Sequence, residues 1–369
     1  MVYRWKNTAL SIFLLLTSLC LSFLVGEIAL RFAGYHGAPQ SYISNIYQVD
    51  DPILDWRYVP NSEVRLGKLI FKYNQAGFRD VDHEITKAQG IRRIVVVGDS
   101  VSEGNGVESE YIFARVLQSR LGAGYEVINI AASGLNTPQE VRLFELQGLQ
   151  YKPDLVILNF VLNDADFYSN LAGAKRYYAE KDTRVGILNL PIHPELKRLL
   201  KSSALIYFVK ERVGNLIVRL TGTGQSHYDY YTTLWSDEGN RIKVTSGFDR
   251  LAELRESSPF ELIVIIWPVL TDYTNYRYTH IHKWIEEQAR KRGFATLDLL
   301  AAFSRMPFQQ LQVASEDSVH PNDLGHATAA DTFLAWYRTQ IASMRVVWSR
   351  ATLQLADCAR PLPSCGLGF

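Results

Sequence analysis

Three residues of this chain could together make a hydroxyl group nucleophilic. Ser100 follows the apolar run of residues 94–97, and Asp317 and His320 stand close together far downstream. A serine hydroxyl attacks a carbonyl carbon when a base takes its proton, and an imidazole acts as that base when a carboxylate orients it. We therefore expect Ser100 to be a nucleophile, His320 its base and Asp317 the orienting acid.

Two further segments follow strand-like runs, one carrying Gly134 and the other spanning residues 161–164. The order Gly-Asp-Ser, glycine, Asn-Asp and Asp-x-x-His resembles the SGNH hydrolase family, also called GDSL esterases and lipases. The last segment, residues 317–325, has the family's D-x-x-H-P-N-x-x-G form. The G-x-S-x-G elbow of α/β-hydrolases is not present around the serine, which disfavours that family. The resemblance covers residues 90–340.

The resemblance implies a role for each segment. It makes Ser100 the nucleophile, His320 the base and Asp317 the orienting group. It places an oxyanion hole at the backbone N–H groups of Ser100 and Gly134 and at the side-chain amide of Asn163. Each such donor contributes about 3 kcal/mol to stabilising a tetrahedral intermediate.

One position departs from the family's pattern. The family usually has glycine two residues before the asparagine, as G-x-N-D, and this chain has Val161 there. A β-branched residue resists a positive φ. We therefore expect the turn after this strand to differ from the family's, and Asn163 to be the donor most affected.

Each residue also has a structural interpretation. Ser100 could cap a turn, Asp317 could cap the helix that begins near Pro321, and Gly134 could be an ordinary turn glycine. A histidine such as His320, taken alone, is more often structural than catalytic. Catalysis is favoured because all four segments occur in order, each beside a strand end or a helix start.

Strand-like and helix-like segments alternate along the chain, which is typical of a parallel sheet between helices. We predict an α/β, three-layer, flavodoxin-like SGNH fold with a five-stranded parallel sheet. The expected strands are residues 92–98, 126–131, 154–160, 261–267 and 294–298. The expected helices are residues 111–121, 138–150, 243–256, 273–291 and 322–344.

The hydrolase domain is expected to span residues 81–345 and to contain an insertion at residues 165–242, with a helix near residues 195–220. Residues 346–369 would form a C-terminal tail. Four aromatic residues of the insertion either line a sugar or acyl rim or pack the insertion onto the core, and packing is preferred: Tyr228, Tyr230, Tyr231 and Trp235.

Residues 27–80 would join this domain to the N-terminus. They end in an Asn-x-x-Gly-Phe-Arg segment that membrane-attached relatives often carry, so we expect the segment to belong to the folded domain. Gly77 is predicted in a turn, with Phe78 buried.

The N-terminus predicts a membrane anchor. Arg4 and Lys6 precede an uncharged apolar run over residues 9–25. This run is short for a membrane span but longer than most signal-peptide cores, and no clear cleavage site follows it. We expect residues 1–7 to be a cytoplasmic stub and residues 8–26 an uncleaved single-pass anchor in the inner membrane. A cleaved signal peptide is the alternative.

Charge and cysteine content limit the other possibilities. A net charge of +1 offers no electrostatic basis for nucleic-acid binding. Cys20 lies in the apolar run, whereas Cys358 and Cys365 could pair in an oxidising compartment. His280 and His282 lack further ligands at metal spacing and are expected on an exposed helix. Neither a metal nor an organic cofactor is expected.

The sequence thus predicts a membrane-anchored serine esterase, facing the periplasm or exterior, that removes O-acyl and chiefly acetyl groups from envelope or extracellular glycans. Three alternatives remain open. An O-acyltransferase would use the same acyl-enzyme, a lipid esterase would act on esters near the bilayer, and a non-catalytic glycan-binding or assembly protein would keep only the fold. The expected partners are the ester-bearing glycan or lipid and the membrane, while protein partners are unknown.

Overall fold

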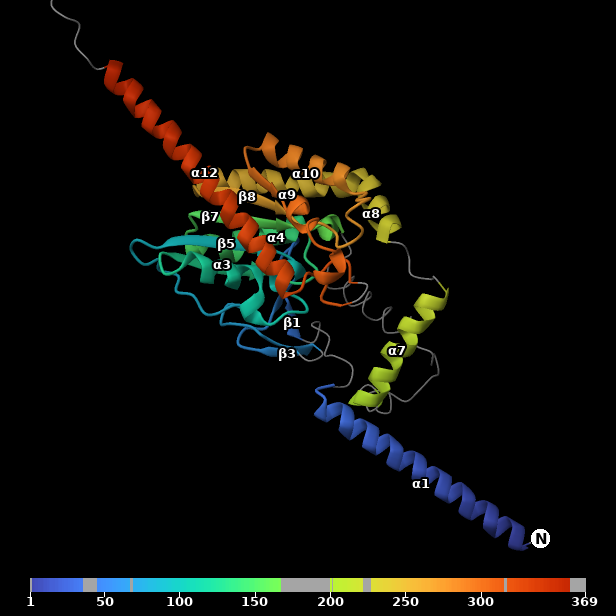
Figure 1. Ribbon diagram of the computed structural model, residues 1–369. Coiled ribbons are helices and arrows are strands. Elements are labelled where there is room, and N and C mark those ends of the chain that lie inside the picture. Colours follow the sequence, from blue (N-terminus) through green and yellow to red (C-terminus); the bar gives the residue numbers. More distant parts are fainter. Residues whose placement is uncertain are drawn as a thin grey trace, which may run out of the picture.

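The computed structural model describes residues 2–35, 45–66, 69–166, 200, 202–221, 227–314 and 317–358. Its centre is a five-stranded parallel sheet with the strand order β6-β5-β7-β8-β9 (Figure 1). This is the flavodoxin-like order, in which the second strand of the sheet lies outside the first. The strands are β5 (Arg92–Gly98), β6 (Tyr125–Ala131), β7 (Leu155–Phe160), β8 (Glu261–Ile266) and β9 (Ala295–Asp298). All five predicted strands are confirmed.

Helices cover both faces of the sheet. One layer contains α3 (Phe113–Leu121), α11 (Leu300–Phe303) and α12 (Asp323–Cys358), and the other contains α4 (Thr137–Leu143), α9 (Glu238–Ser257) and α10 (Thr279–Lys291). Successive side chains of a strand point to opposite faces. Ile94 and Val96 therefore pack under α3 and α12, whereas Val95 and Val97 pack under α4 and α9. The three-layer architecture is thus confirmed.

Several helices differ from their predicted bounds. An Asp237 cap, whose side chain accepts a hydrogen bond from the Asn240 N–H at 3.1 Å, starts α9 before the predicted residue 243. Asp272 accepts the Thr274 N–H at 2.9 Å in a turn, so α10 begins after the predicted residue 273. The helix predicted over 138–150 is α4 followed by the short turns Phe144–Gly148 and Leu149–Tyr151, and α12 runs on to Cys358.

The N-terminal helix α1 (Val2–Phe32) contains the one helix segment in the described residues that is long and apolar enough to cross a membrane, Leu10–Phe32. Its 23 residues span about 35 Å, and none of its apolar window is buried. A membrane anchor and a signal sequence share these properties. The helix ends beside α7 (Ala204–Thr221), where the Glu27 side chain accepts the backbone N–H groups of Ala204 and Leu205 at 3.0 and 2.9 Å.

Two antiparallel hairpins connect α1 with the sheet. They pair β1 (Ile46–Gln48) with β2 (Trp56–Tyr58), and β3 (Glu63–Leu66) with β4 (Leu69–Lys72). Gly77 has a φ of +81°, and a side chain there would meet the Tyr58 carbonyl oxygen at 2.8 Å. Phe78 is buried in the same apolar cluster as α4 and α9. The predicted Gly77 turn and Phe78 burial are both confirmed.

Part of the predicted insertion lies outside the described residues, including residues 167–199 and therefore the start of its predicted helix. The described part contains α7 and α8 (His227–Ser236). On α8, Tyr231 and Trp235 are buried, and the Trp235 Nε1–H donates to the Leu162 carbonyl at 2.8 Å. These two aromatic residues pack the insertion onto the core. Tyr230 donates to Asp166 at 2.8 Å, and the side chain of Tyr228 is not described.

The exposed helix predicted around His280 and His282 is wrong for the second residue. His282 lies on α10 but is buried, because its Nδ1 faces Asp298 at 2.9 Å and its Nε2 faces the Tyr276 hydroxyl at 2.9 Å. Tyr276 lies in the loop before α10 and Asp298 ends β9, so the polar sequence of the helix itself does not indicate these contacts. The Cys358–Cys365 pairing lies outside the described side chains.

A buried histidine joins the two helices of one layer. His326 of α12 is fully buried, and its Nδ1 accepts the Phe113 N–H at 3.2 Å. Burial, and then the electrostatic interactions with Arg79 and His320, lower the pKa of His326 to about 3. The imidazole is therefore neutral in the folded protein at neutral pH.

Acid should destabilise the fold through this residue. The unfolded chain, with a histidine pKa of 6.5, binds the proton before the folded protein does, so stability falls as the pH drops from 6.5 towards 3. Between pH 7 and pH 5 this should remove about 2 kcal/mol from the free energy of unfolding. Urea unfolding of the full chain in detergent should show a correspondingly smaller pH dependence for His326→Gln. Equal dependence in both proteins would contradict the assignment.

Candidate active site

Ser100 stands where β5 ends. It is the first residue of α2 (Ser100–Glu103), a single helical turn that Asp99 caps by accepting the Val101 N–H at 2.9 Å. Asp99, and not Ser100, is therefore the capping residue of this turn. As the first helical residue, Ser100 has no intrahelical partner for its N–H group.

Ser100, His320 and Asp317 form a continuous hydrogen-bonded chain. His320 Nε2 lies 2.9 Å from the Ser100 Oγ, and His320 Nδ1 lies 2.9 Å from an Asp317 carboxylate oxygen. Ser100 is buried at 7% exposure, whereas the side chains of His320 and Asp317 are 24% and 27% exposed. The structure thus brings together the three residues that the sequence singles out for nucleophilic chemistry.

Asp317 uses its two oxygens for different purposes. One accepts the backbone N–H groups of Val319 and His320 at 3.0 and 2.9 Å, and the other faces the imidazole. Burial favours the neutral acid, but the hydrogen bonds from His320 and from the backbone hold the pKa of Asp317 below its usual range. Asp317 does not cap α12, because Asn322 does so by accepting the Gly325 N–H at 3.1 Å.

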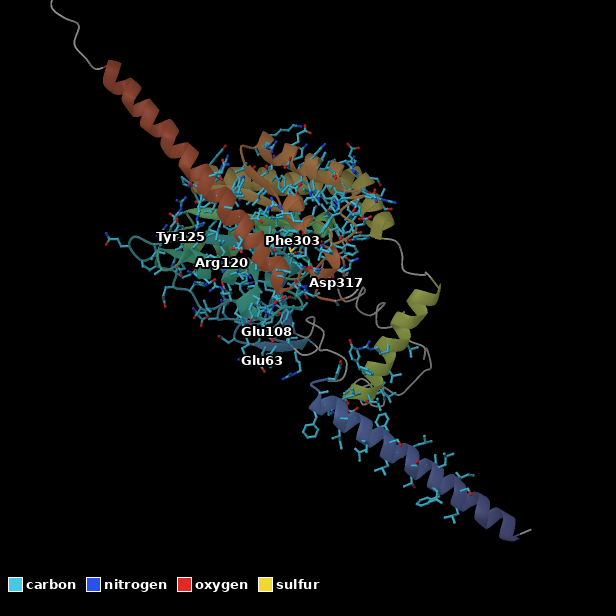
Figure 2. The ribbon with its side chains drawn as sticks, viewed as in Figure 1. Glu63, Glu108, Arg120, Tyr125, Phe303 and Asp317 are labelled. Carbon is cyan, nitrogen blue, oxygen red and sulfur yellow. The ribbon has the colours of Figure 1, made fainter. Side chains whose placement is uncertain are left out.

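Figure 2 places Asp317 near the start of α12, far from Tyr125, the first residue of β6. The site therefore lies at the carboxyl edge of the sheet, as open α/β folds require of a ligand site. The loop before α12 is held there by the Leu270 N–H, which donates to the Ser318 carbonyl at 2.7 Å. Gln312 donates in turn to the Leu270 carbonyl at 3.2 Å.

Of the three expected oxyanion donors, the Ser100 N–H belongs to α2, whereas Gly134 follows β6 and Asn163 follows β7. Gly134 has a φ of +80°, a left-handed conformation that favours glycine. Within the described part of the chain, its N–H group makes no hydrogen bond. Asn163 lies on the short 3-10 helix Leu162–Ala165, and its Nδ2 donates to the Asp99 Oδ2 at 2.9 Å. The same Asp99 oxygen is 3.2 Å from the Ser100 Oγ.

Val161 requires no unusual backbone conformation. Its φ of −114° and ψ of 150° are those of an extended strand, which a β-branched residue adopts readily. The Asp164 side chain accepts the Val161 N–H at 2.7 Å and so closes the turn. Asn163 is therefore presented to Asp99 without any glycine at position 161.

Sequence reasoning missed three buried carboxyl groups beneath the serine. Asp99, Glu140 and Asp164 place carboxylate oxygens within 4.8 Å of one another. Burial, together with the neighbouring acids, raises the pKa of Glu140 and of Asp164 well above the usual range. The shift favours the protonated forms of these two groups and so opposes a build-up of negative charge beside Asp99. The Gly-Asp-Ser sequence itself was the available signal for Asp99.

Comparison with known proteins places the chain in a family. A family model described as the GDSL-like Lipase/Acylhydrolase family matches residues 96–328. No curated protein gives a significant match.

Solved structures with a similar chain trace include TesA, with 14% identity over 66% of this chain and 97% of that chain, at a TM-score of 0.40. A carbohydrate acetylesterase family member from Sinorhizobium meliloti has 13% identity over 68% and 100%, at 0.39. A lipase/acylhydrolase from Enterococcus faecalis has 16% identity over 68% and 97%, at 0.39. These scores are too low to bear on function.

The family match spans more than half of the chain and contains all four sequence segments. The chain therefore belongs to the GDSL-like lipase/acylhydrolase family and is an ester-hydrolysing enzyme.

Proposed function

We propose that this protein is a serine esterase in which Ser100, His320 and Asp317 form the catalytic triad. The observation that carries the proposal is the unbroken hydrogen-bonded chain from the Ser100 Oγ through both nitrogens of His320 to Asp317. A hydroxyl, a base and an orienting acid in this order are what acyl transfer requires.

In the proposed reaction, the Ser100 Oγ attacks the ester carbonyl carbon while His320 Nε2 takes the hydroxyl proton. The negative charge on the carbonyl oxygen is stabilised by the N–H groups of Ser100 and Gly134 and by the Asn163 amide. Asn163 Nδ2 carries two hydrogens, so one can donate to Asp99 while the other faces the oxyanion.

Collapse of the tetrahedral intermediate breaks the bond between the carbonyl carbon and the alcohol oxygen, and His320 returns its proton to the leaving alcohol. A water molecule then attacks the acyl-enzyme, with His320 again taking a proton. The carboxylic acid leaves and the Ser100 hydroxyl is restored. Asp317 stabilises the imidazolium at both steps.

We propose that α1 is an uncleaved single-pass anchor in the inner membrane and that the catalytic domain faces the periplasm or exterior. Arg4 and Lys6 before the apolar segment favour a cytoplasmic N-terminus. An enzyme held at that surface meets envelope glycans, so the proposed substrates are O-acyl and chiefly O-acetyl esters of such glycans. This assignment of substrate is an inference from location and family.

Ser100→Ala should reduce the turnover of p-nitrophenyl acetate by the full chain in detergent on the order of 10⁴-fold, because the nucleophile is lost. Ser318→Ala is the matched control. It removes a buried hydroxyl next to Asp317 that has no hydrogen-bond partner among the described residues, and it should keep wild-type turnover. Equal activity of Ser100→Ala and wild type would refute the nucleophile.

Asp317→Asn should also lower kcat on the order of 10⁴-fold. The asparagine oxygen can still accept the Val319 and His320 N–H groups, but its amide would face His320 Nδ1 with a donor and favour the wrong tautomer. Asp323→Asn, an exposed residue in the first turn of α12, is the control. Full activity of Asp317→Asn would show that the carboxylate does not orient the imidazole.

The full chain is incubated with O-acetylated or with deacetylated polysaccharide, and acetate is measured by ¹H NMR. We expect acetate release from the O-acetylated polysaccharide, and we expect Ser100→Ala to abolish it. Acetyl transfer to the deacetylated glycan without acetate release would instead identify an acyltransferase. Turnover confined to long-chain acyl esters would identify a lipid esterase. Binding of the glycan without any turnover would identify a non-catalytic protein.

A further inference from the structure

A further buried acid, Glu103, connects the parts of the site. Glu103 is the last residue of α2, the helical turn that Ser100 begins, and its side chain is fully buried. Two tyrosine hydroxyls donate to its carboxylate, Tyr58 at 3.1 Å and Tyr73 at 2.8 Å. The Ser133 N–H donates at 2.6 Å, and the Ser133 hydroxyl makes a further short hydrogen bond. Four donors thus share two oxygens.

These donors come from segments that the proposed reaction must keep together. Ser133 precedes Gly134, so the Ser133 N–H bond to Glu103 holds the peptide next to the proposed oxyanion donor. On the other side of Gly134, the Leu135 N–H donates to the Ala132 carbonyl at 3.4 Å. With both flanking N–H groups bonded, the direction of the Gly134 N–H relative to Ser100 depends on where Glu103 lies.

The two tyrosines belong to the part of the chain between α1 and the sheet that contains both hairpins. We call it the hairpin segment; it runs from β1 through β4 to Arg79. Tyr58 ends β2, and Tyr73 follows β4. Arg79 of the same segment donates to the Glu103, Gly104 and Val107 carbonyls at 3.1, 2.5 and 2.6 Å, and its guanidinium lies 3.6 Å from the centre of the Phe71 ring. The hairpin segment therefore binds the Glu103 side chain through its two tyrosines, and it binds the Glu103 and Gly104 carbonyls through Arg79.

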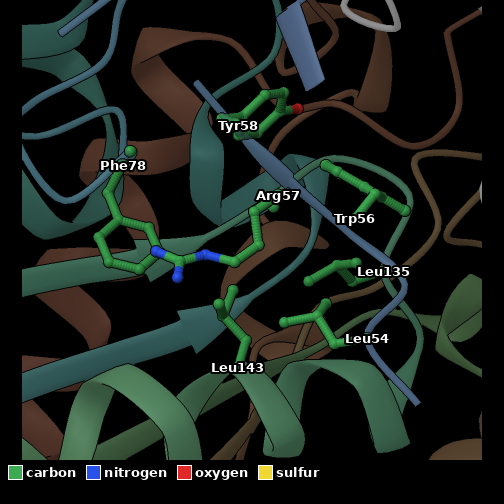
Figure 3. Close-up of a pocket in the computed structure, with 9 residues that line it drawn as sticks. Leu54, Trp56, Arg57, Tyr58, Phe78, Leu135 and Leu143 are labelled. Carbon is green, nitrogen blue, oxygen red and sulfur yellow. The ribbon is translucent and has the colours of Figure 1, made fainter. Parts of the chain in front are cut away.

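Apolar side chains also make contacts between the hairpin segment and the loop that carries Ser133 and Gly134. Figure 3 shows Leu135 beside Leu54 and Trp56 of the hairpin segment, in a small pocket that Tyr58 also lines. Ala132 also lines it. The residues on either side of Ser133 and Gly134 are thus packed against the hairpin segment.

If position 103 served only to pack the core, an apolar side chain would do so with less loss of free energy, because burying a carboxylate requires its desolvation. That desolvation raises the pKa of Glu103, while the hydrogen bonds from Ser133 and Tyr73 oppose the shift. Hydrogen bonds with defined directions set the orientation of a peptide group, which apolar packing does not.

We propose that Glu103 is a positioning residue, held by Tyr58 and Tyr73, that sets the distance between the Ser100 and Gly134 backbone donors. The inference rests on the proposed function and extends it, because it makes the membrane-proximal hairpins part of the catalytic unit. A displaced donor binds the tetrahedral intermediate less tightly, whereas binding of the ground-state ester is little changed.

The test uses Tyr58→Phe, Tyr73→Phe, their combination, Glu103→Gln and Glu103→Leu, in the full chain in detergent. Tyr337→Phe is the matched control, because it removes a buried tyrosine hydroxyl that donates to Glu261 at 3.3 Å at the opposite edge of the sheet. Hydrolysis of p-nitrophenyl acetate supplies kcat and KM. An arylboronic acid, which forms a tetrahedral adduct with an active serine, supplies an inhibition constant.

The Tyr58→Phe/Tyr73→Phe double variant should lose about 10- to 100-fold in kcat and in boronate affinity, with KM nearly unchanged. Glu103→Gln keeps one acceptor for the Ser133 N–H and should retain more activity than Glu103→Leu. Wild-type kcat and boronate affinity in the folded double variant would overturn the positioning role. A wild-type enzyme that the boronate does not inhibit, together with an active Ser100→Ala variant, would overturn the proposed function as well.

Discussion

Parallel pairing of β5 with both β6 and β7 is the constraint on which the site depends. The register aligns Gly98 with Ala131 and Val97 with Leu158, so the three strands end at nearly the same level. The loops that leave these strands carry Ser100, Gly134 and Asn163. Residues that are far apart in sequence are therefore neighbours before any side-chain contact forms, and the apolar residues packed on both faces of β5 keep the strands in this register.

Strand pairing alone does not orient individual side chains and peptide groups. Hydrogen bonds to buried acids provide that orientation. Asp99 caps the serine helix with one oxygen and accepts the Asn163 amide with the other. Glu103 accepts hydrogen bonds from Ser133 and from two tyrosines at the opposite end of the same turn. A buried carboxylate is favourable only when its acceptors are used, so each acid specifies one arrangement of the segments around it.

The sequence predicted the sheet well because strands buried on both faces are continuous apolar runs with turn residues at their ends. The proposed nucleophile, base and acid could be named from the sequence because they stand in two short segments, Gly-Asp-Ser and Asp-x-x-His. The proposed roles of Tyr58 and Tyr73 could not be predicted from the neighbouring sequence, since they depend on contacts with Glu103. The burial of His282 likewise depends on side-chain contacts, with Asp298 and Tyr276, and was not predicted. Val161 departs from the family's pattern, but its backbone is extended and the chain needs no glycine there.

The contact between Glu27 and α7 couples α1 to the described part of the insertion. The Glu27 carboxylate accepts the first N–H groups of α7 and the Ser203 hydroxyl at 2.8 Å, so it acts as a helix cap supplied by a distant segment. Such coupling is reciprocal: whatever stabilises the first turn of α7 also stabilises the carboxyl end of the leader helix, by the same free energy. A chain that keeps α1 therefore has a capped first turn of α7, and a chain without α1 lacks that cap.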